Sequence, residues 1–301
     1  MPAPSLDVWL HGVLVAQVTE RRTGRFQLRY RDEALARWPR GRPLLSVSMP
    51  LRVEPFPPGV VGPFLDGLLP EGEARAVLED RYGLRRGDVA GLLAQIGRDC
   101  AGAIVVVGAG EPPPAEPPAG PADAAALSEP LDEAALVAAV RDLPQRPFGD
   151  GDQVRVSLAG QQRKLLLARG SDGAWRWPLG GTPSTHILKP ADQREPHMAQ
   201  NEVLCLRLAR ELGLTEVDAE VQQLGEHAVV VVSRYDRRLR DGRIERLHQE
   251  DVCQALAVDL GARGARNSEG EGGPGFAQVA QLLEVHGCGT GRPAGGGRDA
   301  R

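Results

Sequence analysis

Apolar and polar residues alternate through much of the first 107 residues. The alternation breaks at His11-Gly12, which favours a turn, so the flanking segments are expected to pair as a hairpin. This spacing predicts strands over Leu6 to Leu10, Val13 to Val18, Phe26 to Tyr30, Leu44 to Met49 and Ile104 to Val107. Leu84 to Ile96 has a helical period instead, with core positions at Leu84, Leu92, Leu93 and Ile96. Residues 1–107 are therefore predicted to form a β-rich N-terminal domain.

Strands and helices are mixed in the second half of the chain. Strands are predicted over Val154 to Leu158, Leu165 to Ala168, His186 to Lys189, Val217 to Leu224 and His227 to Val232. Helices are predicted over Leu131 to Leu143, His197 to Leu212, Arg246 to Leu256 and Phe276 to Leu283. The second of these helices carries Leu204, Leu208 and Leu212 at helical spacing before Gly213 stops it. The predicted fold class is α+β, with a second domain over residues 131–285.

Two segments show no hydrophobic period. Residues 108–130 are rich in Pro, Ala, Gly and Glu, which predicts a linker. Residues 286–301 are dominated by Gly, Arg and Ala, which predicts a disordered tail. The longest apolar runs are too short to cross a bilayer, and no signal-peptide pattern is evident at the N-terminus.

Composition narrows the choice of partners. Lys plus Arg number 36 and Asp plus Glu number 40, giving a net charge of −4 over 301 residues. This balance argues against binding nucleic acid by bulk charge, although a local basic patch stays open. Cys100, Cys205, Cys253 and Cys288 are scattered without a Cys-x-x-Cys pair, which argues against zinc and disulfides and favours a reducing cytosol.

A glycine loop followed by a strand that ends in a lysine carries the clearest chemical pattern. The loop is Ala159 to Lys164, and the later strand ends at Lys189. Gly160 would let backbone N–H groups approach phosphates, and Lys189 would supply a point charge for them. This is the layout of a protein-kinase N-lobe. On its own, the pattern favours an ordinary turn and a solvated lysine over a phosphate-binding site.

The wider sequence resembles the HipA family of toxin proteins. The residues that carry the resemblance are Ser157, Ala159, Gly160, Gln162, Lys164 and the run Pro183 to Pro190, which match Ser-x-Ala-Gly-x-Gln-x-Lys and Pro-Ser-Thr-His-Ile-x-Lys-Pro. Further matching segments are Phe64 to Gly72, Ile96 to Ala103, Arg234 to Arg237, Leu247 to Asp251 and Gly272 to Phe276. The resemblance implies a serine/threonine kinase with a β-rich N-terminal domain, a kinase-like N-lobe and, here, an incomplete helical C-lobe.

The resemblance also implies a set of site residues. ATP would be bound by Ala159, Gly160, Gln161, Gln162, Arg163, Lys164, Lys189, Ser233, Arg234 and Tyr235. Mg²⁺ would accompany ATP in complete members of the family. Ser157 matches the family's phosphorylatable serine.

Several charged residues admit two interpretations. Glu202 is either the partner of Lys189 or an exposed glutamate favoured by the helix dipole. Arg234, Asp236 and Arg237 form structural ion pairs or contact substrate, and Asp99 is expected to pair with its neighbour Arg98. His248 is expected to make a structural hydrogen bond rather than take part in catalysis.

The resemblance is expected to end near Leu283. The family's Asp-x-His-x-Lys-Asn loop and its metal-binding aspartate are not found, so no catalytic residue and no metal ligand is assigned. The chain is accordingly expected to be truncated or frameshifted, and inactive as a kinase. The resemblance implies a cytoplasmic location, a HipB-like helix-turn-helix antitoxin as partner, DNA contact only through that antitoxin, and an unknown protein substrate. The alternatives are a non-catalytic pseudokinase fragment that binds the antitoxin, and a gene remnant.

Overall fold

The computed structural model describes residues 5–112, 128–149, 155–192, 194–195, 197–240, 243–259 and 273–286. The predicted linker and tail therefore lie largely outside the described residues. In chain order the elements are β1 (Ser5–Leu10), β2 (Val13–Arg22), β3 (Arg25–Tyr30), α1 (Asp32–Arg37), α2 (Pro58–Asp66), α3 (Gly72–Arg81), α4 (Val89–Ile96), β4 (Ile104–Gly108), α5 (Glu133–Asp142), β5 (Leu165–Arg169), β6 (Trp175–Arg176), β7 (His186–Pro190), α6 (Met198–Glu211), β8 (Ala219–Leu224), β9 (His227–Ser233), β10 (Arg237–Arg240), β11 (Arg243–Arg246), α7 (Val252–Ala255) and α8 (Phe276–His286). This mixture of sheets and helices is an α+β fold, as the sequence predicts.

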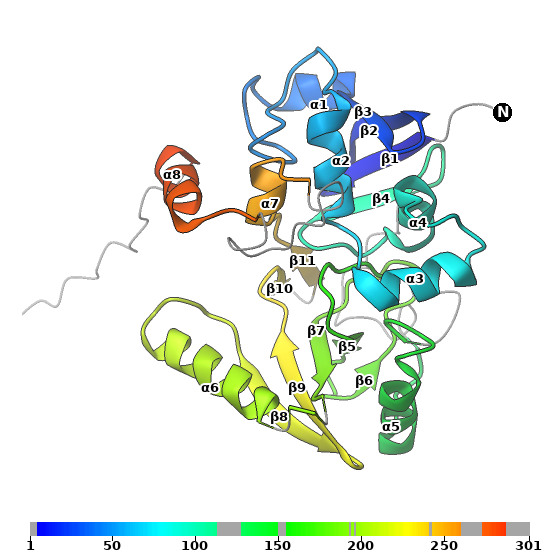
Figure 1. The fold of residues 1–301 in the computed structure, drawn as a ribbon, viewed down its shortest axis with the longest axis vertical. Coiled ribbons are helices and arrows are strands. Elements are labelled where there is room, and N and C mark those ends of the chain that lie inside the picture. The colour runs from blue at the N-terminus through cyan, green and yellow to red at the C-terminus, as the bar shows by residue number, and fades with distance from the viewer. Residues whose placement is uncertain are drawn as a thin grey trace, which may run out of the picture.

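The N-terminal sheet is antiparallel, with the strand order β3-β2-β1-β4. Val8 of the central strand β1 lies opposite both Ala16 of β2 and Val106 of β4. Alternate apolar residues of these strands form one core with α2 and α4, which lie beside the sheet in Figure 1. The predicted hairpin, third strand and strand from Ile104 are confirmed.

The strand predicted over Leu44 to Met49 is wrong, because this segment is irregular and β4 is the fourth strand of the sheet. The segment's backbone groups bond a part of the chain some two hundred residues later. The amide of Val47 donates to Glu250 Oε1 at 2.8 Å, and His248 Nε2 lies 2.9 Å from the carbonyl oxygen of Leu45. The apolar pattern reflects burial in the N-terminal core, not strand pairing.

The second sheet is also antiparallel and has the order β6-β5-β7-β9-β8. Successive residues of β9 face opposite sides of it. Val229 and Val231 pack in a core with α5, whereas Val230 and Val232 pack in a core with α6. The two helices thus cover opposite faces of one sheet (Figure 1), and β7 lies between β5 and β9.

The strand predicted over Val154 to Leu158 is wrong for its described residues, and position 154 itself lies outside them. The segment forms isolated bridges, Val156 with Asp99 and, a little further on, Gly160 with Pro70. Both partners belong to the N-terminal domain. The glycine loop is therefore not the turn of a hairpin: it connects a segment aligned along the N-terminal domain to β5.

The helix predicted from Arg246 begins only at Val252. Arg246 ends β11, and His248 and Glu250 then bond the N-terminal domain before the helix starts. Asp251 caps α7 and forms a capping box with Gln254. Gln254 Nε2 also donates to the carbonyl of Phe64 on α2 at 2.9 Å. This short helix therefore joins the late part of the chain to the N-terminal domain.

The leucine stripe of α6 faces outward. Leu204, Leu208 and Leu212 are 65%, 58% and 65% exposed, while Ala199 and Val203 pack against β8 and β9. No residue of α8 is buried. Within the described part of the chain, no helix is long and apolar enough to cross a membrane.

Candidate nucleotide-binding site

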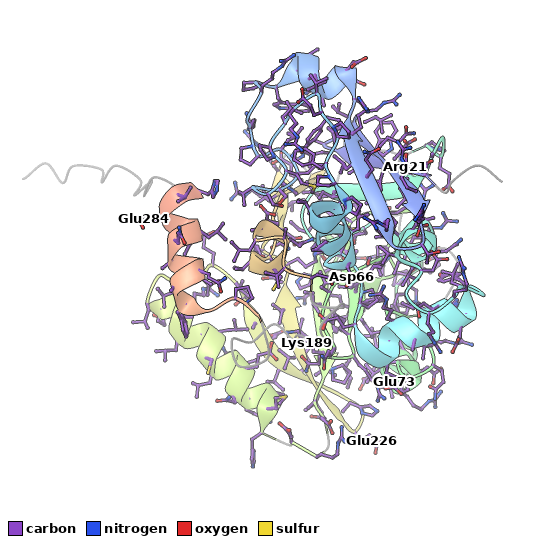
Figure 2. The ribbon with its side chains drawn as sticks, turned by 45° about the horizontal axis from the view of Figure 1, so that its top comes forward. Arg21, Asp66, Glu73, Lys189, Glu226 and Glu284 are labelled. Carbon is purple, nitrogen blue, oxygen red and sulfur yellow. The ribbon has the colours of Figure 1, made fainter. Side chains whose placement is uncertain are left out.

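Lys189 forms an ion pair with Glu202 on the face of the second sheet that α6 covers. β7 carries the lysine and α6 carries the glutamate, and Lys189 Nζ donates to Glu202 Oε1 at 2.6 Å. The side chains are 23% and 26% exposed, so both are partly shielded from water. Figure 2 shows Lys189 in the middle of the view, between the N-terminal domain and α6. Of the two interpretations of Glu202, the structure therefore supports the one in which it is the partner of Lys189.

Lys164 provides a second positive charge close by. Its Nζ donates to the carbonyl oxygen of Ala159 at 2.6 Å and is almost completely buried. Burial and, to a lesser extent, the neighbouring Lys189 lower the pKa of Lys164 to about 8, while Glu71 opposes the shift. The segment Ala159–Lys164, which we call the nucleotide loop, thus folds back on itself through its own lysine.

Lys164 and Lys189 are the only two lysines in the 301-residue sequence, against 34 arginines. Arginine is permanently charged and planar, whereas lysine is a compact point charge that can titrate. In this chain lysine therefore occurs only at the two positions that lie within electrostatic range of each other in the candidate site.

The nucleotide loop is fixed to the N-terminal domain. Gly160 has φ +108°, a conformation that strongly favours glycine, and its carbonyl accepts from the amide of Glu71 at 3.4 Å. Arg163 pairs with Glu73 at 2.8 Å, while Gln161 and Gln162 are exposed. A cavity of about 50 Å³ lies against the loop, far smaller than a typical ligand pocket of roughly 300 Å³ or more. Neither Lys189 nor Ser233–Tyr235 lines this cavity.

Ser233–Tyr235, which we call the hinge segment, is predicted to border adenine. Its first two amides are bonded within the fold, Ser233 N to Asp218 O and Arg234 N to Thr185 O, both at 2.9 Å. The Arg234 side chain is buried, whereas Tyr235 is 61% exposed. The guanidinium of Arg234 therefore has a structural role, and adenine binding by this segment stays a prediction.

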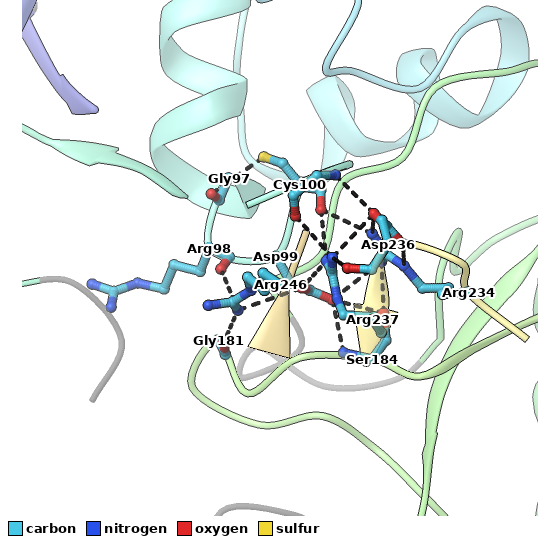
Figure 3. A network of polar contacts seen from close by, with 11 residues as sticks. Gly97, Arg98, Asp99, Cys100, Gly181, Ser184, Arg234, Asp236, Arg237 and Arg246 are labelled. Atoms are coloured by element: carbon cyan, nitrogen blue, oxygen red, sulfur yellow. Dashed lines mark hydrogen bonds and ion pairs between the residues drawn. The ribbon is translucent and has the colours of Figure 1, made fainter. Parts of the chain in front are cut away.

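Asp99 lies at the centre of a buried network between the two domains, shown in Figure 3. Burial alone would raise the pKa of Asp99, but three arginines hold it well below its ordinary value. We call this set the interdomain network; its members are Asp99, Ser184, Arg234, Asp236, Arg237 and Arg246. The sequence supports structural ion pairs for Arg234, Asp236 and Arg237 but gives no sign that Asp99 is their partner.

The expected pair between Asp99 and Arg98 is wrong. Arg98 instead lies 3.0 Å from Glu111, and Asp99 faces the opposite domain. His248 makes the structural hydrogen bond predicted for it, to the carbonyl of Leu45. The prediction assumed that neighbouring opposite charges pair. In the fold, Asp99 pairs with arginines more than a hundred residues away.

Ser157, the predicted phosphorylatable serine, is completely buried. Its Oγ donates to the carbonyl of Leu68 at 2.6 Å, and its amide donates to the carbonyl of Asp99 at 3.0 Å. A kinase can reach this hydroxyl only after the segment leaves the N-terminal domain.

The described residues contain no group of three or more His, Cys, Asp or Glu side chains that could hold a metal ion. Charge in the site is instead supplied by the two lysines. A lysine on a central strand, paired with a helix glutamate beside a glycine loop, is the arrangement of the small lobe of a protein kinase. The fold and site therefore define a kinase-like protein.

Comparison with known families gives the same result in finer detail. Residues 6–107 match the HipA N-terminal domain, and residues 156–294 match the HipA-like C-terminal domain. The second match extends past Leu283, where the resemblance was expected to end. The chain belongs to the HipA family.

Individual relatives cover most of the chain. It is 39% identical over 281 residues to "Putative kinase Y4mE" of Sinorhizobium fredii, covering 92% of this chain and 64% of that protein. It is 31% identical over 208 residues to the serine/threonine-protein kinase toxin HipA of Shewanella oneidensis, covering 68% and 45%. A solved Shewanella oneidensis complex of HipA, HipB and operator DNA matches with a TM-score of 0.72 at 26% identity, covering 93% and 64%. The chain thus spans less than two thirds of the length of these relatives.

Proposed function

We propose that this chain is the nucleotide-binding part of a HipA-type serine/threonine kinase and binds ATP. The observation that carries the proposal is the Lys189–Glu202 pair at 2.6 Å, because kinases use such a pair to hold a lysine against the phosphates. The second lysine, Lys164, and Gly160, with its positive φ, lie in the adjoining loop. The family relationship supports the same activity.

In this proposal each group acts by position and charge. Glu202 holds the Lys189 ammonium between β7 and α6, where it neutralises phosphate charge. Lys164 gives up its bond to the carbonyl of Ala159 when a phosphate oxygen offers a stronger one. Tyr235, exposed on the hinge segment, borders the base. Mg²⁺ would accompany ATP, but the described residues hold no group of three or more His, Cys, Asp or Glu side chains that could bind it, and no step is assigned to the metal.

We further propose that these 301 residues do not transfer phosphate by themselves. Phosphoryl transfer needs a group that orients the attacking hydroxyl and carboxylate or amide ligands for the metal. The sequence holds no Asp-x-His-x-Lys-Asn motif to supply them. The chain is therefore proposed to bind ATP more weakly than a complete kinase does, because fewer groups converge on the ligand.

The proposed partner is a HipB-like helix-turn-helix antitoxin. Support comes from the similarity to the solved Shewanella oneidensis complex of HipA, HipB and operator DNA. The N-terminal domain carries no chemistry of its own and is the proposed contact surface, with DNA reached through the antitoxin. A second candidate function follows from the same relationship: a pseudokinase module that occupies the antitoxin without using ATP.

Calorimetric titration with ATP separates these functions. Lys189→Ala should weaken binding about tenfold or more, since a charge-assisted hydrogen bond contributes roughly 1.5–3 kcal/mol. Arg194→Ala is the matched control, because Arg194 lies just beyond β7 and its side chain is 87% exposed. Equal affinities for the native chain and Lys189→Ala would remove the lysine from the site. Absence of ATP binding, together with retention of a HipB-like protein, would favour the pseudokinase module.

A separate assay tests phosphate transfer. The 301-residue chain is incubated with labelled ATP and Mg²⁺, and Ser157 and cell-extract proteins are examined for label. No incorporation is expected. Incorporation that Lys189→Ala abolishes would show that catalytic groups exist that the sequence does not reveal.

A further inference from the structure

The backbone of Asp99 is hydrogen-bonded to the residues that immediately precede the nucleotide loop. Its amide donates to the carbonyl of Arg155 at 3.1 Å, and its carbonyl accepts from the amide of Ser157 at 3.0 Å. Ser157 lies two residues before Ala159, where the nucleotide loop begins. The N-terminal domain thus fixes the chain immediately ahead of the loop.

The carboxylate of Asp99 holds the start of the strand that carries Lys189. Its Oδ2 accepts from both the amide and the hydroxyl of Ser184, at 2.9 Å and 2.7 Å. Ser184 is completely buried and lies two residues before β7. Because β7 is a short strand, an anchor at its N-terminal end also fixes the position of Lys189 along the strand.

The same carboxylate reaches the hinge segment. Arg237 approaches Oδ1 at 2.8 Å, and Arg234 approaches Oδ2 at 3.5 Å (Figure 3). The Arg234 amide in turn donates to the carbonyl of Thr185, next to Ser184. One side chain of the N-terminal domain is therefore bonded to the residue two positions before β7, to the hinge segment through Arg234, and to the start of β10 through Arg237.

The contacts made by Asp99 depend on its charge. It is completely buried, and the surrounding arginines keep it ionised even though burial opposes this. Arg234 and Arg237 share one other carboxylate, Asp236, so loss of the Asp99 charge leaves two buried guanidinium groups with a single anion. Such a change is expected to rearrange the hinge rather than leave it in place.

We propose that Asp99 is a positioning residue through which the N-terminal domain sets the geometry of the nucleotide site. It holds three parts in register: the nucleotide loop, β7 with Lys189, and the hinge segment. A partner that shifts the N-terminal domain would consequently change nucleotide affinity without touching the nucleotide. This inference rests on the proposed ATP binding, but its main test does not require ATP.

Glu79 is the matched control that separates a positioning role of Asp99 from a purely stabilising one. Glu79 is also a buried carboxylate of the N-terminal domain, 2% exposed and paired with Arg75 and Arg86. Among the described residues its partners all lie within that domain, including the amide of Gly87. Glu79→Gln should therefore cost stability without disturbing the nucleotide site.

The two lysines report directly on the geometry of the site. The full 301-residue chain is treated briefly with an amine-acylating reagent, and the rates at Lys164 and Lys189 are measured by mass spectrometry, with the α-amino group as internal reference. Asp99→Asn should raise both rates several-fold, because Lys164 is released from burial and Lys189 from its pair with Glu202. Glu79→Gln should leave them unchanged. Native-like rates in folded Asp99→Asn, or equal increases in both variants, would overturn the proposal.

ATP binding supplies the second measurement. Asp99→Asn should weaken it by about tenfold, within the usual range for coupling between sites, while Glu79→Gln should not. If no chain binds ATP but the lysine rates follow Asp99, the proposed function fails and the positioning role stands. If ATP binds and the rates ignore Asp99, the positioning role alone fails.

Ser184→Ala keeps the test decisive should Asp99→Asn not fold. It removes the 2.7 Å hydroxyl bond while leaving every charge in place. Acylation of Lys189 should then rise more than that of Lys164, because Ser184 anchors β7 and not the loop. An unchanged rate at Lys189 would contradict the proposal.

Discussion

The amino group of Lys164 lies over the α-carbon of Gly160, so close that a β-carbon there would be 2.9 Å from Nζ. Gly160 also has φ +108°, which side chains rarely adopt. The backbone conformation therefore favours glycine at this position, and a side chain there would also push the end of Lys164 aside.

Gly160→Ala is expected to displace Lys164 and weaken ATP binding. Strain at this φ should also lower the free energy of unfolding by about 1 kcal/mol or more. Gly173→Ala is the control, because Gly173 has φ +79° in a turn with open space around it. Urea denaturation should show a loss for both variants, whereas the loss of ATP affinity should be confined to Gly160→Ala. Equal ATP affinities in all three chains would contradict the prediction.

ATP binding is expected to weaken as pH rises above 8. Burial lowers the pKa of Lys164 to about 8, so its ammonium form, which phosphate prefers, is lost above that pH. Loss of one charge-assisted hydrogen bond of about 1.5 kcal/mol corresponds to about tenfold in affinity. Lys164→Arg, which stays charged, should show a flatter profile in calorimetry between pH 7 and pH 9.5. Parallel profiles would exclude Lys164 from phosphate contact.

The same lysine makes a prediction for stability without ligand. Its pKa is lower in the folded chain than the ordinary value of 10.5, so the unfolded chain binds more protons between these values. The free energy of unfolding contributed by this group should therefore rise from about pH 8 to about pH 10.5. Lys164→Met should remove that rise in urea denaturation measured across this range. A rise of the same size in both chains would assign it to other groups.

Gln254→Ala is expected to loosen the docking of α7 on the N-terminal domain. The buried carbonyl of Phe64 would lose its donor, which costs about 1–3 kcal/mol. Gln223 bonds the carbonyl of Gly225 at 3.0 Å on the surface, so Gln223→Ala should cost far less. Comparable losses from the two substitutions in urea denaturation would show that the Gln254 contact is not a significant part of the docking.

The exposed stripe of α6 should promote association. Replacing Leu204 and Leu208 by Gln is expected to reduce dye binding and self-association without loss of stability, because both side chains face outward. Val203→Gln on the opposite face should destabilise the chain by about 2 kcal/mol or more, since Val203 is buried. Size-exclusion chromatography and thermal unfolding measure the two effects. An unfolded double variant would show that the stripe is packed.

The second sheet could be predicted from the sequence because its information is local. Strands β7 and β9 and helix α6 each have a clear period, and the spacing of Lys189 and Glu202 suits a strand followed by a helix. The sequence leaves the Lys189–Glu202 contact open against an exposed glutamate, and the structure forms the pair. Similarly, the hairpin β1–β2 follows from the turn at His11-Gly12.

The failures share one physical cause. Leu44 to Met49 and Val154 to Leu158 bond partners far away in the sequence, so their apolar patterns are those of burial and not of a strand. Asp99 looks like a turn residue beside Arg98, and nothing local shows that it is buried among arginines. The signal that could have indicated this is the excess of arginine over acid in residues 234–246, a segment in which Arg234 and Arg237 prove to be buried.

The ribosome makes Asp99 long before the arginines that pair with it. Arg234 follows it by 135 residues and Arg237 by 138. At about 5–20 residues per second, a ribosome needs roughly 7 to 28 seconds to make that interval. The strands β1 to β4 can pair as soon as β4 emerges, while the carboxylate still faces water. The ion pairs of Asp99 with Arg234 and Arg237 can therefore form only after these arginines have been made, so the proposed geometry of the nucleotide site is reached late in synthesis.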